Sequence, residues 1–160
     1  PETFGNLKHL TWLSLNDNQL TSLSESFGQL LNLTHLELQK NKLKTLPVSF
    51  GELKNLTWLS LNENQLNTLP ESFGQLTNLQ ILDLSSNQFV TLPEVFETLE
   101  NLQKLYLEEN QIDSIPENFR NLQKLEEIYL LDNPLAQSQE KQYQVEQLLP
   151  NCKIFLQINE

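Results

Sequence analysis

The chain has 160 residues, with 21 acidic against 10 basic residues, a net charge of −11 and one cysteine. This charge argues against nucleic acid and anionic membrane surfaces as partners, because both attract basic proteins. A single cysteine also excludes an internal disulfide framework.

The first predicted element in chain order is a short strand, and the pattern LxxLxLxxNxL that carries it returns every 23 residues. Two apolar residues alternate with polar neighbours, as Leu13 and Leu15 do, which is typical of a strand with one buried face. A fixed period of this length predicts stacked units whose strands form one parallel sheet. The predicted strands lie near residues 10–16, 33–39, 56–62, 79–85, 102–108 and 125–131.

An asparagine follows each predicted strand at the same position. Backbone groups at such a turn lack partners in the sheet, and an amide side chain can both donate to them and accept from them. We therefore expect a ladder of buried amides that links neighbouring units. Its members are Asn18, Asn41, Asn64, Asn87, Asn110 and Asn133.

The return segment of each unit also has fixed positions. Proline begins it at Pro1, Pro47, Pro70, Pro93 and Pro116, and Ser24 takes that place once. A fixed φ and a missing N–H favour an irregular turn over a full helix. The next column is expected to fill the core behind the sheet with aromatic rings. It consists of Phe4, Phe27, Phe50, Phe73, Phe96 and Phe119, followed by glycine at Gly5, Gly28, Gly51 and Gly74 and by Glu97 and Arg120 in the later units.

The last part of the chain departs from the pattern. Between Asn133 and Pro150 it has no glycine, contains good helix formers and predicts a cap helix that ends before the proline. Leu149, Cys152 and Ile154 then repeat LxxLxL, which predicts a seventh strand that closes the sheet. In this alignment Cys152 points into the core as a small hydrophobic residue rather than serving as a nucleophile.

Written as LxxLxLxxNxLxxLPxxFGxLxN, the units resemble leucine-rich repeats of the 23-residue class over about 135 residues. The resemblance implies an α/β fold. It implies a right-handed solenoid with a parallel sheet on the concave face and 3₁₀ or extended segments on the convex face, and we expect a C-terminal cap helix. We expect residues 1–160 to form a single domain, with the cap over residues 133–160. The ending LLPNCKIFL is similar to the closing segment of bacterial members, which favours a bacterial origin.

The polar positions of the strands are expected to face the concave side in three columns. Trp12, His35 and Trp58 follow one another in the first column, and exposed aromatic side chains on a rigid sheet are typical of interface anchors. Two alternatives are that these side chains merely cover the sheet, and that Trp12 packs against a preceding repeat. The candidate partner-binding residues are Trp12, His35, Trp58, Ile81, Glu37, Asp83, Tyr106, Tyr129 and Glu108.

Charge gives a second indication about the partner. The concave columns and the loop position beyond them hold eight carboxylates and two lysines, a net charge of −6. This favours a partner protein with a basic surface, because complementary fields speed encounter and exclude wrong partners. The alternative is a solvated acidic surface that keeps the chain soluble.

No set of residues in the sequence has the spacing of a catalytic, metal or cofactor site, so we expect no enzyme activity, metal or cofactor. His35 is interpreted as a hydrogen-bonding contact residue rather than a metal ligand.

The leading interpretation is a non-catalytic scaffold that binds a partner protein on its concave face, as a bacterial secreted, surface or effector protein. One alternative is a substrate-recognition domain of a larger enzyme or ligase. Another is a structural module that self-associates through the first strand, whose edge is unpaired. Because the sequence begins in mid-unit without Met, we expect a processed or truncated chain. A secreted or surface location is favoured over the cytoplasm, without membrane insertion.

Overall fold

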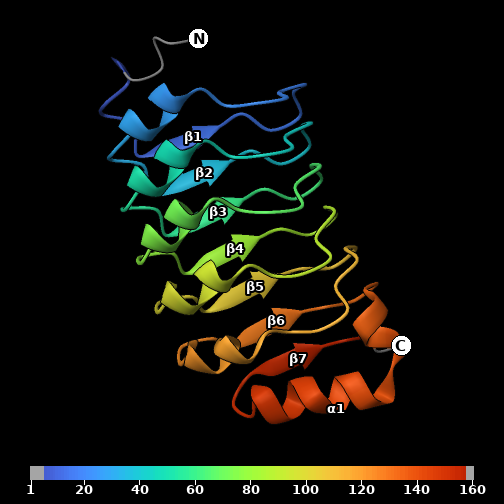
Figure 1. Ribbon diagram of the computed structural model, residues 1–160. Helices are drawn as coiled ribbons and strands as arrows, with labels where there is room; N and C mark the ends of the chain where they lie inside the picture. The colour runs from blue at the N-terminus through green and yellow to red at the C-terminus, as the bar shows by residue number, and fades with distance from the viewer. Residues whose placement is uncertain (1–5, 158–160) are drawn as a thin grey trace.

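The computed structural model describes residues 6–157, and in it the strands form one parallel sheet in chain order (Figure 1). Each strand has three residues, so the strands are shorter than the predicted ranges but lie inside them. From β1 to β6 each residue pairs with the one 23 positions later, as Leu13 does with Leu36. The bounds are β1 Trp12–Ser14, β2 His35–Glu37, β3 Trp58–Ser60, β4 Ile81–Asp83, β5 Lys104–Tyr106, β6 Glu127–Tyr129 and β7 Lys153–Phe155.

Short 3₁₀ helices form the convex side, stacked in the same order as the strands (Figure 1). They are η2 Glu25–Gln29, η3 Val48–Glu52, η4 Glu71–Gln75, η5 Glu94–Thr98 and η6 Glu117–Asn121. Pro47, Pro70, Pro93 and Pro116 each precede one of them with an extended backbone. The sequence prediction of a right-handed solenoid with 3₁₀ segments on its convex face is therefore confirmed. Pro1, Phe4 and Gly5 lie outside the described residues.

The core lies between the sheet and the 3₁₀ helices. Leucines of every unit are buried there, and the phenylalanine column stacks behind them as predicted. The ring centroids of Phe27 and Phe50 are 6.2 Å apart, and those of Phe50 and Phe73 are 6.1 Å apart. Each unit thus buries its apolar residues mainly against its neighbours, which is how a repeat array becomes stable.

The asparagine ladder links each unit to the one before it. Asn64 Nδ2 donates to the carbonyls of Leu38 and Leu61 at 3.0 Å, and its Oδ1 accepts from Leu43 N at 3.0 Å. Asn133 makes the equivalent bonds, although it precedes the cap, and it is only 2% exposed. Asn18 is exposed, and within residues 6–157 its amide donates only to carbonyls of its own unit.

We expect Asn64→Ala and Asn133→Ala each to lower the free energy of unfolding by about 1 to 3 kcal/mol, because each leaves buried backbone groups without partners. Asn18→Ala is the matched control and should cost less, since water reaches its backbone partners. Urea unfolding followed by circular dichroism measures all three variants. Equal midpoints for Asn18→Ala and Asn64→Ala would contradict a structural role for the ladder.

The residue before each asparagine adopts a left-handed backbone conformation, with φ between 50° and 56°. The six residues carry acidic, basic or hydroxyl side chains and none is glycine, so no single residue type marks this conformation in the sequence. Left-handed φ is unfavourable for most residues other than glycine, asparagine and aspartate. Here the backbone turns away from the sheet at the same point in every unit. The residues are Asp17, Lys40, Glu63, Ser86, Glu109 and Asp132.

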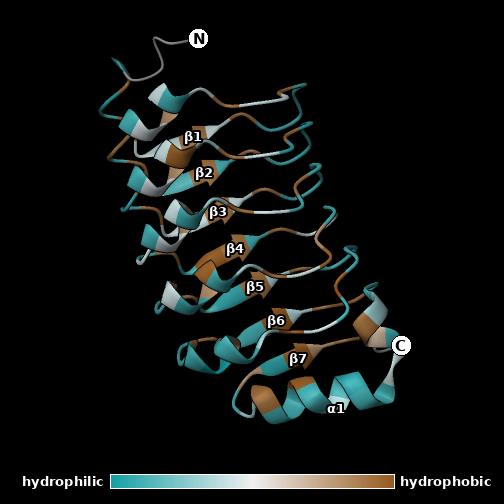
Figure 2. Cartoon of the chain, in the orientation of Figure 1, coloured by the Kyte–Doolittle hydropathy of each residue, from teal (hydrophilic) through white to brown (hydrophobic). Residues whose placement is uncertain are grey.

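The cap begins with a 3₁₀ helix, η7 (Pro134–Gln137), and continues with the helix α1 (Gln139–Leu148). Ser138 caps α1 by accepting a hydrogen bond from Lys141 N. Val145 of α1 and the following Leu149 are buried in the core. Figure 2 shows most of α1 as hydrophilic, with a hydrophobic end, and Figure 1 shows α1 beside β7 at the C-terminal end of the stack. The predicted cap helix and closing strand are confirmed.

The predicted register of the closing strand is wrong by two residues. Ile128 pairs with Ile154, not with Cys152, so Ile154 takes the inward column that contains Leu13. The connection through η7 and α1 is longer than in the preceding units, and the leucine pattern alone aligned the wrong residues. As a result Phe155, rather than Lys153, lies beside Tyr129 on the concave face.

Candidate functional site: the concave face of the sheet

The parallel register places the predicted site residues in rows across the concave face. The first row runs from Trp12 through His35, Trp58 and Ile81 to Lys104 and Glu127. The second row contains Glu37, Asp83, Tyr106 and Tyr129. Glu108 lies two residues beyond Tyr106 in the chain. Neighbouring members of a row lie about 4.8 Å apart along the sheet.

The N-terminal half of the face carries the tryptophan patch, which consists of Trp12, His35 and Trp58. Trp12 is 56% exposed, His35 is exposed and Trp58 is half-buried. The rings of His35 and Trp58 stack with centroids 6.2 Å apart. The His35 Nδ1 atom also lies 3.0 Å from Thr34 Oγ1. The patch offers aromatic contact area that the core does not use.

The C-terminal half of the face carries an aromatic ladder of Tyr106, Tyr129 and Phe155. The centroids of Tyr106 and Tyr129 lie 4.5 Å apart, and those of Tyr129 and Phe155 lie 4.3 Å apart, with nearly parallel planes in both pairs. Tyr106 and Tyr129 are among the partner-binding residues predicted from the sequence, whereas Phe155 is not. The signal was present, because Ile154, Phe155 and Leu156 repeat the arrangement of an aromatic residue between two aliphatic ones.

Charged groups hold the ladder in place on one side. Lys104 Nζ lies 2.9 Å from a carboxylate oxygen of Glu127, and the Tyr129 hydroxyl donates to the same oxygen at 3.0 Å. The bond from Lys104 lowers the pKa of Glu127, and the bond to Glu127 raises the pKa of Lys104. Burial, together with the bond to Glu127, raises the pKa of Tyr129 to about 12. Lys104 is therefore neutralised locally, and the phenol stays protonated at neutral pH.

Glu108 differs from the other carboxylates of the face. Its Oε2 atom is buried and has no hydrogen-bond partner among the described residues. Burial, with the nearby charges of Asp83 and Glu109, raises the pKa of its carboxyl group. Asp83 Oδ1 accepts hydrogen bonds from the Ser85 backbone N–H at 3.0 Å and from the Ser85 hydroxyl at 2.7 Å. The face thus holds a carboxylate whose charge is destabilised in the absence of a cation.

Glu108→Gln is expected to stabilise the protein at pH 7. A carboxyl whose pKa is raised on folding contributes stability below its unfolded pKa and loses that contribution as the pH rises through its folded pKa. The substitution removes the buried charge, so the melting temperature should rise at pH 7 and the gain should disappear near pH 4. Thermal unfolding of both proteins at the two pH values measures this difference. A gain in melting temperature that is the same at both pH values would contradict a raised pKa for the Glu108 carboxyl group.

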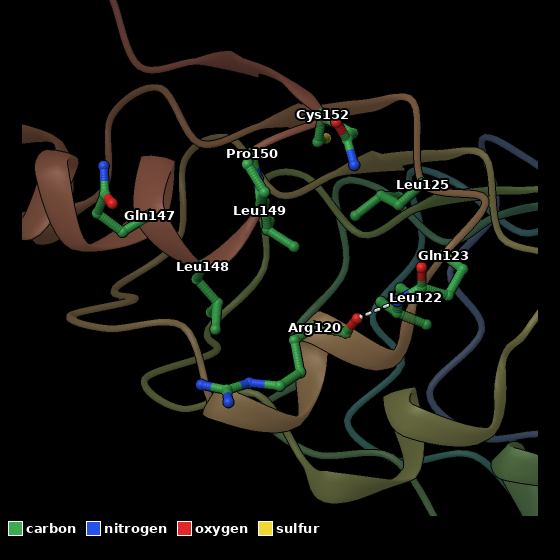
Figure 3. A pocket seen from close by; sticks show the side chains of 10 residues that line it. Arg120, Leu122, Gln123, Leu125, Gln147, Leu148, Leu149, Pro150 and Cys152 are labelled. Carbon is green, nitrogen blue, oxygen red and sulfur yellow. Dashed lines mark hydrogen bonds between the residues drawn. The ribbon is translucent and has the colours of Figure 1, made fainter.

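A cavity of about 380 Å³ lies away from this face, between the last repeat and the cap. Figure 3 shows Leu148, Leu149 and Cys152 on its cap side, and Arg120 and Leu122 on the side of the repeat. Burial raises the pKa of the Cys152 thiol to about 11, so the thiol is protonated at neutral pH. Cys152 is half-buried and packs against the core, consistent with a packing role, although it lies outside the predicted column.

Within residues 6–157, no group of three or more His, Cys, Asp and Glu side chains is placed to hold a metal ion. In the same part of the chain, no helix has the length and apolar character needed to cross a membrane.

Family models identify the repeats independently of the geometry. The model described as "Leucine-rich repeat region" matches residues 51–149, more than half of the chain, and the model described as "Leucine rich repeat" matches residues 1–43. The chain belongs to the leucine-rich repeat family. Proteins of this family generally serve as scaffolds that bind other proteins.

Two solved structures of bacterial proteins are similar to this leucine-rich repeat chain. A leucine-rich repeat protein of Leptospira interrogans is 30% identical, with a TM-score of 0.66, and the match covers 96% of this chain and 50% of that one. The functional domain of InlJ from Listeria monocytogenes, which includes a cysteine ladder, is 24% identical with a TM-score of 0.69. That match covers 81% of this chain and 27% of the Listeria chain, and at this identity it shows the shared fold. The search of curated proteins gave no significant match.

A cysteine ladder is a feature of the Listeria domain that this chain does not share. This chain has one cysteine, so it has no cysteine ladder. Its repeats are joined instead by the asparagine amides and the stacked phenylalanines. Hydrogen bonds and apolar packing thus link neighbouring units here without thiol groups.

Proposed function

We propose that this protein is a non-catalytic scaffold that binds a partner protein on the concave face of its sheet. The observation that carries the proposal is the tryptophan patch, whose Trp12 side chain is 56% exposed on a surface built from backbone-paired strands. Large aromatic side chains on a rigid surface supply contact area at low entropic cost, which is why they dominate binding energy at interfaces. In this proposal residues 1–160 act as a single domain.

The partner is proposed to present a basic surface. Carboxylates on the concave face and the adjoining loops outnumber lysines by eight to two. Lys104 is paired with Glu127 at 2.9 Å, which leaves the field of the face acidic. An acidic surface attracts basic partners over a distance of about one Debye length, roughly 8 to 10 Å in physiological salt.

The proposed setting is a bacterial surface or secreted protein. Support comes from the Leptospira and Listeria structures and from the ending LLPNCKIFL, which resembles the cap of bacterial members with repeats of the 23-residue class. A second candidate function is recognition of a substrate for a larger protein. It is favoured by the matched chains, of which this chain spans 50% and 27%. Both candidates use the same concave face.

The double variant Trp12→Ala with Trp58→Ala tests the proposed function. It should lose capture of the proteins that the wild-type chain retains from a lysate, because it removes the main aromatic contact area. Its free energy of unfolding should stay within about 1 kcal/mol of wild type, since surface substitutions open no cavity. Capture followed by mass spectrometry, with thermal unfolding in parallel, measures both results.

The matched control is Glu71→Ala with Glu94→Ala on the convex side, where both side chains are exposed. Glu25 is less suitable, because its carboxylate accepts a hydrogen bond from Ser49 N at 2.9 Å. The control should bind as wild type does. Binding by the tryptophan variant at wild-type strength would exclude the patch as the site, and unfolding of that variant would show that the tryptophans support the core.

A further inference from the structure

One end of the aromatic ladder is open. Tyr129 has a ring on each side, with Tyr106 at 4.5 Å and Phe155 at 4.3 Å. The ring normals therefore run along the sheet, perpendicular to the strands. Tyr106 has an aromatic neighbour toward β6, and its other face is directed toward β4.

Carboxylates lie beside that open face. Asp83 of β4 is the register partner of Tyr106, so the two side chains are neighbours about 4.8 Å apart along the sheet. Asp83 Oδ1 is occupied by Ser85, whereas Oδ2 has no hydrogen bond among the described residues. Glu108 follows Tyr106 on the same strand side, and its buried Oε2 has no partner either.

Nothing in the described part of the chain neutralises these carboxylates. Lys104, the nearest lysine on β5, is held on the opposite side of Tyr106 by Glu127, at 2.9 Å. Glu109, the residue after Glu108, adds a further negative charge, and its carboxylate accepts a hydrogen bond from the Ser86 hydroxyl. Half-buried Ile81 precedes Asp83 by two residues and adds an apolar wall.

We propose that Tyr106, Asp83 and Glu108 form a binding site for an arginine side chain of the partner protein. The proposal rests on the proposed function and names the chemistry of one contact. A guanidinium group is planar, stacks on an aromatic face and donates to carboxylates in two directions at once. Stacked on Tyr106, it would donate to Asp83 Oδ2 and place its positive charge beside the Glu108 carboxylate, and its alkyl stem would pass over Ile81. An ammonium group has the same charge but cannot stack as a plane.

The test uses N-acetyl-L-arginine amide as the probe and the ¹⁵N-labelled chain as the receptor. Addition of the probe should give saturable shifts of backbone amides in β4 and β5. The methylene protons of the probe next to the guanidinium should shift upfield, because they lie over the tyrosine ring. N-acetyl-L-lysine amide should bind more weakly, and equal or tighter binding of the lysine probe would overturn the assignment to arginine.

Two variants separate the charge from the ring. Asp83→Asn with Glu108→Gln keeps the shape of both side chains and should weaken binding of the arginine probe at least about tenfold. Tyr106→Ile removes the ring while filling the space beside Tyr129, and should abolish the upfield shift. Glu71→Gln with Glu94→Gln removes the same charge from the convex side and should leave binding unchanged. Shifts spread over the whole acidic surface, or equal weakening by the convex variant, would overturn the proposal.

Failure of the proposed arginine site can be told apart from failure of the proposed scaffold function. Loss of protein capture by the tryptophan variant, combined with no saturable binding of the arginine probe, would retain the concave scaffold and reject the arginine site. Saturable binding of the probe at β4 and β5 that the two site variants remove would support the site, whatever the tryptophan variant does.

Discussion

Phe73→Ala is expected to lower the free energy of unfolding by about 3 to 5 kcal/mol, as large-to-small changes of phenylalanine in packed cores do. Phe73 is fully buried in the middle of the stack, and its ring lies 6.1 Å from that of Phe50. The substitution removes the ring and leaves a cavity that the regular stack of units cannot close without moving its backbone. The neighbouring unit loses a stacking partner at the same time.

Urea unfolding followed by circular dichroism measures this loss. Val48→Ala is the matched control, because Val48 lies on the same convex side but is 68% exposed, and it should change stability by less than about 0.5 kcal/mol. A cost for Phe73→Ala no larger than that of the valine control would show that the phenylalanine column does not support the core.

Gly51→Ala is expected to cost about 3 kcal/mol, at the upper end of the range for overpacking. A Cβ atom at this position would lie 2.2 Å from the carbonyl oxygen of Ser72 and 2.7 Å from its carbonyl carbon. Both are backbone atoms of the next 3₁₀ region, so neither can rotate away. None of the described glycines has a positive φ, and the requirement at Gly51 is therefore one of space rather than of backbone conformation.

Gly74→Ala is the internal comparison. There the nearest atom to an added Cβ is the Thr98 hydroxyl at 2.6 Å, which belongs to a side chain that can adopt another rotamer. It should cost less than about 1 kcal/mol, mainly through the exposed hydrogen bond from Thr98 to the Gly74 carbonyl. Thermal unfolding of the two variants measures the difference. Equal losses of stability for Gly51→Ala and Gly74→Ala would show that the space beside Gly51 is no tighter than the space beside Gly74.

The sequence alone explains the expected effect of Phe73→Ala, but it does not explain the expected effect of Gly51→Ala. The phenylalanine column is visible in the sequence as a residue that recurs every 23 positions, and its place behind the sheet follows from that period. The glycine column is visible too, but its purpose is not. Only the positions of Ser72 and Thr98 reveal why Gly51 is required more strictly than Gly74.

On the concave face, too, some positions follow from the sequence and others do not. The rows that contain Trp12, His35 and Trp58 could be predicted, because alternation along a strand assigns each side chain to one face and the period aligns the strands. The 23-residue period does not place Phe155, since the cap inserts a helix and changes the spacing, and only the alternation of Ile154, Phe155 and Leu156 marks it. The closing register is decided by which residues reach the sheet after α1 has packed against the last repeat.

The sequence by itself determined the solenoid, its parallel sheet, the asparagine ladder, the phenylalanine column and the cap helix, because a repeated pattern fixes local conformation and neighbour contacts together. The tertiary structure decided the left-handed turns at residues such as Glu63, the stack of Tyr106, Tyr129 and Phe155, and the unpartnered oxygen of Glu108. These features depend on which side chains share space across neighbouring strands and on how far water is excluded between them. A one-dimensional period cannot specify such distances, because they arise only after the units have stacked.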